Sequence, residues 1–105
     1  MAITKEKAVK TAVVKVLKEY GEAVYYFYPV MGGYGASGIP DIVGCYLGRF
    51  FAIECKAGKG KTTALQEKNI AQIKNALGRV MVVNEDNIQD VRVMLDDIAT
   101  FNGRR

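Results

Sequence analysis

Two acidic residues and a lysine stand where two consecutive strands could bring them together. Asp41 follows Pro40, and Glu54 and Lys56 are separated by one residue in the apolar run 50–57. Residues i and i+2 of a strand point to the same face of a sheet, so Glu54 and Lys56 should project together. Charges in a strand that looks buried are costly unless they are paired or bind a ligand. We therefore expect chemistry here, although E-x-K alone is usually an ion pair on a solvent face.

The turn between these two strands decides where Asp41 lies. A tight hairpin with its turn at 48–49 places Asp41 opposite Lys56 and on the same face as Glu54. The two carboxylates then form a cross-strand diagonal, roughly 5–8 Å apart. A single hard cation can bridge that distance. A slip of one residue would instead turn Asp41 to the opposite face.

The composition limits which metal this site could hold. The sequence has no histidine and only 2 cysteines, which excludes Ser-His-Asp and Cys-His catalysis, His-ligated zinc and four-cysteine zinc sites. A metal held mainly by oxygen points to Mg²⁺, Mn²⁺ or Ca²⁺. The hairpin register puts Cys45 and Cys55 on opposite faces, so we expect free thiols and no disulfide between them.

Two residues on predicted helices could join the site. Glu6 shares a helical stripe with Val9 and so lies at the inward edge of the first helix. An acid in the first turn is also favoured by the helix dipole, which leaves a purely structural explanation open. Gln66 lies on the apolar stripe of the second helix, but with Thr63 it also forms the T-x-x-Q pattern of a capping box. The two explanations for Gln66 are compatible.

The elements that must position these residues alternate between helical and strand patterns. We expect one α/β domain over residues 1–105, with element order α-β-β-β-α-β-α and a central mixed sheet flanked by helices. The predicted helices cover 3–20, 63–77 and 87–101, and the predicted strands cover 23–31, 41–47, 50–56 and 79–83. A glycine-rich loop at 32–38 follows the first strand.

The charge balance suggests a polyanionic partner. The chain has 15 Lys and Arg against 11 Asp and Glu, a net charge of +4. Lys59 and Lys61 on a glycine-rich loop, and Lys10 on the first helix, could grip phosphates without reading sequence. Tyr34 in the loop at 32–38 could stack on an exposed base. A solvated face for the lysines and a packing role for Tyr34 remain alternatives.

Other partners are not supported by the sequence. Gly60-Lys61-Thr62 imitates the end of a P-loop, but the glycine required five residues earlier is replaced by Cys55, so we expect no nucleotide cofactor. Residues 1–10 are charged and lack the apolar core of an export signal. The longest uncharged stretch, 23–40, is broken by glycine and proline, so we expect no membrane span and a cytoplasmic protein.

The ordered set of motifs resembles the VRR-NUC family of the PD-(D/E)xK nuclease superfamily. It consists of G-I-P-D at 38–41, A-I-E-C-K at 52–56 and T-A-L-Q at 63–66, preceded by Glu6 and Val9 of the first helix. The resemblance implies a restriction-endonuclease-like core and a structure-selective DNA endonuclease that needs Mg²⁺ or Mn²⁺, most specifically a Holliday-junction resolvase. It also implies a bacterial or phage-infected host cell, and a homodimer for which the aromatic segment 24–28 is a candidate interface.

The resemblance further implies a role for each motif residue. The metal ligands would be oxygens of Asp41, Glu54, the Cys55 backbone carbonyl and, directly or through water, Glu6. Lys56 would position or deprotonate the attacking water or neutralise charge in the transition state, and Gln66 would orient Lys56 or the water. Two alternatives stay open: a nuclease for flap, nicked or ordinary duplex DNA or for RNA, and a catalytically silent DNA-binding module.

Overall fold

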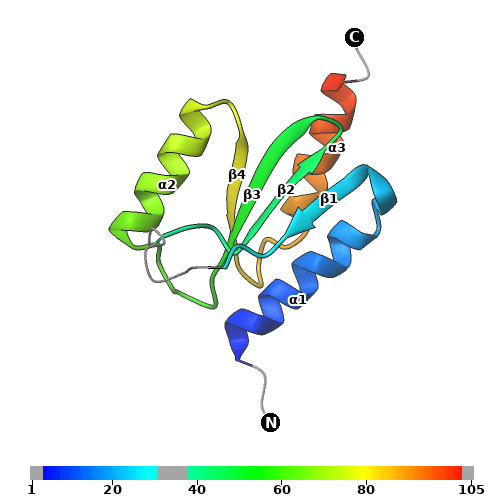
Figure 1. Ribbon diagram of the computed structural model, residues 1–105. Coiled ribbons are helices and arrows are strands. Elements are labelled where there is room, and N and C mark those ends of the chain that lie inside the picture. The colour runs from blue at the N-terminus through cyan, green and yellow to red at the C-terminus, as the bar shows by residue number, and fades with distance from the viewer. Residues whose placement is uncertain (1–3, 31–37, 103–105) are drawn as a thin grey trace.

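A computed structural model describes residues 4–30 and 38–102 as a four-stranded sheet with three α-helices (Figure 1). The elements are α1 (Lys5–Lys18), the short 3₁₀-helix η1 (Gly21–Ala23), β1 (Val24–Phe27), β2 (Ile42–Tyr46), β3 (Arg49–Cys55), α2 (Ala64–Asn75), β4 (Arg79–Val83) and α3 (Asp90–Asn102). The predicted order of α-helices and strands is confirmed. Within the described ranges, none of the helices has the length and apolar character to cross a membrane.

The sheet is mixed, as predicted, with strand order β1-β2-β3-β4. β1, β2 and β3 form an antiparallel meander, and β4 pairs with β3 in the parallel sense. A parallel neighbour requires a crossover connection, and α2 provides it between β3 and β4. The loop that leads into α2 begins at Lys56, the last residue of the E-x-K motif, because β3 ends at Cys55.

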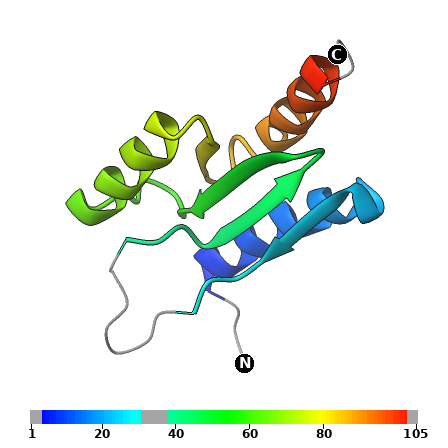
Figure 2. The ribbon, with the colours of Figure 1, turned by 45° about the horizontal axis from the view of Figure 1, so that its top comes forward.

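The hydrophobic core lies between one face of the sheet and helices α1 and α3. Figure 2 shows α1 crossing behind β1 and β2, while Figure 1 shows α2 standing apart beside β4. The apolar stripe of α1 is buried as its spacing predicts. Buried residues alternate along β2, whereas β3 is buried on both faces from Phe51 to Cys55. The main core residues are Val9, Val13, Val16, Leu17, Ile42, Phe51, Ile53, Cys55, Val83, Val91, Met94, Leu95 and Ile98.

The predicted hairpin register is wrong by two residues. Tyr46 pairs with Arg49, so the turn is at 47–48, with positive φ of 51° at Leu47 and 83° at Gly48. A two-residue turn with positive φ at both central positions favours glycine at the second of them. Gly48 takes that position, so the turn lies one residue earlier than predicted. Because the shift of register is even, every side chain keeps its predicted face. Cys45 is exposed and Cys55 is buried, and both are free thiols.

The first strand is also shorter than predicted. β1 extends only over Val24–Phe27, because η1 takes up the residues before it and Pro29 after it has no N–H for a ladder. Tyr34 and residues 32–37 of the glycine-rich loop lie outside the part of the chain that the structure describes.

Candidate active site

Three carboxylates from three separate elements converge at one end of the sheet. Glu6 is in the first turn of α1, Asp41 precedes β2, and Glu54 is in β3. One carboxylate oxygen from each of them lies within 4.8 Å of the other two. The structure therefore brings together the two acids of the hairpin and adds the helical Glu6.

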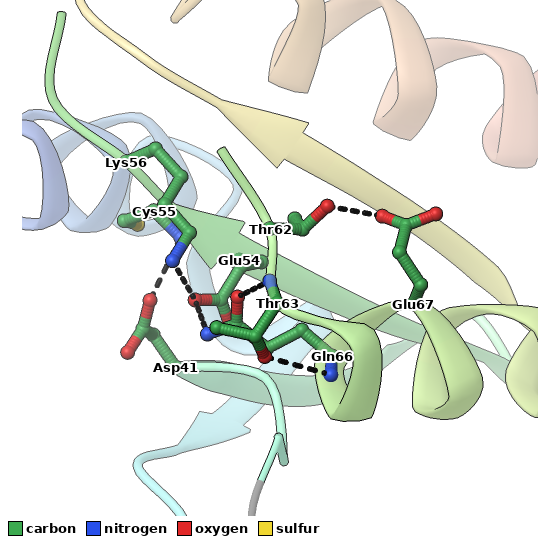
Figure 3. A network of polar contacts seen from close by, with 8 residues as sticks. All are labelled: Asp41, Glu54, Cys55, Lys56, Thr62, Thr63, Gln66 and Glu67. Atoms are coloured by element: carbon green, nitrogen blue, oxygen red, sulfur yellow. Dashed lines mark hydrogen bonds and ion pairs between the residues drawn. The ribbon is translucent and has the colours of Figure 1, made fainter. Parts of the chain in front are cut away.

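Asp41 is held by the backbone of β3. Its carboxylate accepts a hydrogen bond of 2.7 Å from the N–H of Cys55 (Figure 3). Ile42 pairs with Ile53, so one further step along the ladder puts Asp41 opposite Glu54. The predicted position opposite Lys56, with a diagonal to Glu54, is thus corrected to a direct cross-strand neighbour. This relationship brings the two carboxylates closer than the predicted register would.

Glu54 is buried, with only 2% of its surface exposed. One of its oxygens, Oε2, accepts a hydrogen bond of 2.9 Å from Gln66 Nε2 and lies 3.7 Å from Lys56 Nζ. The other oxygen, Oε1, is buried and has no hydrogen-bond partner among the described residues. A buried polar atom without a partner is costly. An oxygen-liganded divalent cation would satisfy Oε1, so the residues present fit such a metal.

The environment of Glu54 disfavours its charged form when no cation is bound. Burial and the neighbouring Asp41 carboxylate raise the pKa of Glu54 to about 7, against the opposing effect of Lys56. Burial, with Asp41 and Glu54 nearby, raises the pKa of the Cys55 thiol to about 12. The Cys55 thiol is therefore protonated at neutral pH and is not a nucleophile.

Gln66 forms the predicted capping box and also contacts the acidic cluster through Glu54. Its backbone N–H donates to Thr63 Oγ1 at 3.2 Å, and its side-chain Oε1 accepts from the Thr63 N–H at 2.8 Å. These two bonds form the capping box that starts α2. The remaining Nε2 donates to Glu54, as Figure 3 shows. The cap thus fixes the amide that holds the buried carboxylate.

Gly38 connects the Asp41 loop to the same helix end, a role that sequence reasoning missed. Its φ is +87°, and a Cβ built on it would lie 2.5 Å from the carbonyl carbon of Leu65 and 2.7 Å from the nitrogen of Gln66. Only glycine fits a backbone that approaches this closely with positive φ. The glycine of G-I-P-D was the available signal, but its contact lies 27 residues away in sequence.

The predicted phosphate-binding lysines lie in two places. Lys59 and Lys61 are exposed on the loop after β3, where the N–H of Gly58 donates to Glu85 at 2.6 Å. This contact with Glu85 was not predicted. Lys10 is on α1 and lines a cavity of about 260 Å³ together with Glu6, Lys7, Asp41 and Cys55. The cavity gives access to Glu6 and Asp41, and Cys55 forms part of its wall.

Comparison with known proteins supports a nuclease relationship. A family model described as archaeal Holliday junction resolvase (Hjc) matches residues 2–83, which include every site residue discussed above except Glu85. A solved structure described as a VRR_NUC domain has a TM-score of 0.68 to this chain at 17% identity, covering 90% of this chain and 97% of that chain. This likeness shows the fold, which is the restriction-endonuclease-like fold that was predicted. Among curated proteins, none matches the chain.

Proposed function

The chain belongs to the archaeal Holliday junction resolvase family of PD-(D/E)xK nucleases, and we propose that it is a metal-dependent endonuclease that cleaves branched DNA, most specifically four-way junctions. The observation that carries this proposal is the convergence of the Glu6, Asp41 and Glu54 carboxylates within 4.8 Å. The Lys56 amine, 3.7 Å from Glu54, is the basic group that the E-x-K motif places beside the acids.

The acids would hold Mg²⁺ or Mn²⁺. Asp41 and Glu54 supply carboxylate oxygens from adjacent strands, Cys55 would add its backbone carbonyl, and Glu6 would bind directly or through water. The buried and unpartnered Oε1 of Glu54 supports a cation at this point. When bound, the ion polarises the scissile phosphate and lowers the pKa of a water molecule.

The neighbouring side chains would orient the reacting groups. Lys56 has only 15% of its side chain exposed, so its amine is confined close to Glu54. There it would position or deprotonate the attacking water, or neutralise charge on the phosphate in the transition state. Gln66 would act as a positioning residue, because its bond to Glu54 holds that carboxylate toward Asp41.

The DNA would be held mainly by its phosphates. Lys59 and Lys61 extend from the loop that follows the motif, and Lys10 lines the cavity that contains Glu6 and Asp41. We keep Tyr34 as a candidate for base stacking. Lysine contacts of this kind add affinity without sequence preference and weaken steeply as salt is raised.

A homodimer would supply the second active site. Symmetric cutting of a four-way junction needs two equivalent sites related by a two-fold axis. Tyr25, Cys45 and Phe50 form one cross-strand row on the sheet face away from α1 and α3, and all three are exposed. Phe27, whose ring centroid is 6.5 Å from that of Tyr25, extends the patch. Because the patch is uncharged, it suits a second copy of the chain better than the DNA backbone.

The proposal is tested by incubating the protein with labelled four-way junction, flap, nicked duplex and single-stranded DNA in Mg²⁺, Mn²⁺, Ca²⁺ or EDTA. We expect symmetric cutting of the junction with Mg²⁺ or Mn²⁺ and none with Ca²⁺ or EDTA. Gel shifts without cutting in any metal would indicate a DNA-binding module. Cutting of flap or nicked DNA while the junction stays intact would indicate a different nuclease.

A further inference from the structure

A groove distinct from the cavity at Glu6 and Asp41 lies along α1, next to Tyr28, the first residue after β1. It has a volume of about 580 Å³ and is lined by Val14, Tyr28 and four lysines, Lys7, Lys10, Lys15 and Lys18, together with Thr11. The lining residues therefore include four positive charges and no Asp or Glu. The roles assigned above involve only Lys10 of this set.

The groove is continuous with the candidate metal site. Lys7 and Lys10 line both this groove and the cavity that contains Glu6 and Asp41. From Lys7 to Lys18, α1 advances by about 16 Å at its usual rise per residue. A strand whose phosphate reaches the acids can therefore continue along the helix past Val14 to Lys18.

Tyr28 provides an aromatic surface in this basic groove. Tyr28 is 46% exposed, and Lys10 Nζ lies 4.2 Å from the centroid of its ring. The ring of Tyr26 contacts it edge to face, with centroids 6.1 Å apart. The Tyr28 ring is thus contacted by Lys10 over one face and by the ring of Tyr26, while nearly half of the residue remains accessible. An aromatic ring within a basic groove is typical of sites that bind unpaired nucleotides.

We propose that the groove binds an unpaired nucleotide of the DNA strand next to the scissile phosphate, with its base stacked on Tyr28 and the strand's phosphates at Lys7, Lys15 and Lys18. A fully stacked duplex has no free base to offer, whereas nucleotides at a branch or flap unstack easily. The groove therefore favours branched DNA over continuous duplex. This inference rests on the proposed function for the identity of its ligand, but not on cleavage.

Binding is measured in EDTA, where no metal-dependent cutting occurs. The probe is a duplex with a short single-stranded flap that carries, at the branch, a fluorescent base analogue whose emission falls when it stacks. A fully paired duplex of the same length is the reference. The proteins are the full chain and its Tyr28→Phe, Tyr28→Leu, Lys18→Ala and Lys74→Ala variants. Lys74, in the last turn of α2, is the control for loss of a lysine outside the groove.

We expect the native chain and Tyr28→Phe to quench the analogue equally. Tyr28→Leu should lose the quenching and bind the flap probe about 5- to 150-fold more weakly, as expected for one lost base–aromatic stack. Its affinity for the paired duplex should be unchanged. Lys18→Ala should lower the slope of log affinity against log salt by about one, and Lys74→Ala should leave it unchanged.

The inference is overturned if Tyr28→Leu quenches the analogue and binds the flap as the native chain does. A photoreactive base at the branch gives a second measurement that needs no variant. Crosslinking to Tyr28 in the native chain supports the inference, and crosslinking only to residues outside the groove contradicts it. Failure of the native chain to bind any DNA would overturn the proposed function itself. Binding with equal affinity for flap and paired duplex would overturn only this inference.

Discussion

The side-chain amide of Gln66 holds the buried carboxylate of Glu54 and the N-terminus of its own helix at the same time. Nε2 donates to Glu54 at 2.9 Å, while Oε1 accepts from the N–H of Thr63 at 2.8 Å. The beginning of α2 and the geometry of the acidic site are therefore coupled through one residue. Changes that move the cap should move Glu54 as well.

Replacing the cap residue tests this coupling. Thr63→Ala removes the hydroxyl that accepts from Gln66, so we expect a loss of about 1 kcal/mol in unfolding free energy together with slower junction cleavage. Thr63→Ser keeps the hydroxyl and is the matched control. Urea unfolding and single-turnover cleavage measure the two effects. A Thr63→Ala protein that is less stable but cuts at the native rate would show that the cap does not position the site.

Gly38 should be less tolerant of a side chain than Gly48. Both have positive φ, of +87° and +83°, but a Cβ on Gly38 would clash with the backbone of Leu65 and Gln66, whereas nothing lies within 4 Å of one on Gly48. Gly48→Ala should therefore lose only about 1–2 kcal/mol of unfolding free energy, the cost of holding a residue with a Cβ at positive φ. Gly38→Ala should lose clearly more stability and also cleavage activity. Equal losses of unfolding free energy in the two variants would contradict the close approach at Gly38.

The metal-free protein should become less stable as pH rises toward neutrality. The pKa of Glu54 is raised to about 7 from 4.5, so between these values the folded chain keeps a proton that the unfolded chain has released. Stability then falls as pH rises through this window. Glu54→Gln should flatten this dependence and raise the unfolding midpoint at pH 7 in EDTA. An unchanged pH profile in Glu54→Gln would show that Glu54 is not the group responsible.

The uncharged sheet patch should be needed for dimer formation. Tyr25→Glu places a charge at its most exposed aromatic position, which is 70% exposed. We expect this variant to be monomeric in light scattering after gel filtration. Val93→Glu, at an apolar α3 position that is 65% exposed, is the control and should remain dimeric. A native chain that is monomeric at all concentrations would exclude the proposed dimer.

Local patterns predicted most of the architecture and the main acidic pair. The apolar stripe of α1, the apolar run of β3 and the T-x-x-Q cap are short-range signals, and the structure confirms the buried face of α1, the buried strand and the capping box. The faces of Asp41 and Glu54 were predicted correctly even though the register was not, because the error was an even number of residues. The sheet face of a side chain changes only if the register shifts by an odd number of residues. The register itself depends on which residues adopt positive φ in the turn.

Long-range contacts were the part that sequence reasoning could not supply. Two such contacts join residues 27 positions apart: Gly38 approaches Leu65 of α2, and the N–H of Gly58 donates to Glu85. The periodicity of the sequence does not indicate pairs this far apart. The Gln66–Glu54 bond depends likewise on how α2 packs beside β4. The groove at Tyr28 appears only when the lysine stripe of α1 is placed next to the end of β1.

Junction cleavage by Asp41→Asn tests the central claim most directly. The amide can still accept the hydrogen bond from Cys55, so the loop should stay in place while the charge needed for a divalent cation is removed. With a labelled four-way junction in Mn²⁺, we predict that the native chain cuts and that Asp41→Asn binds the junction without cutting it. Cutting by Asp41→Asn at the native rate would contradict the assignment of these acids as the metal site.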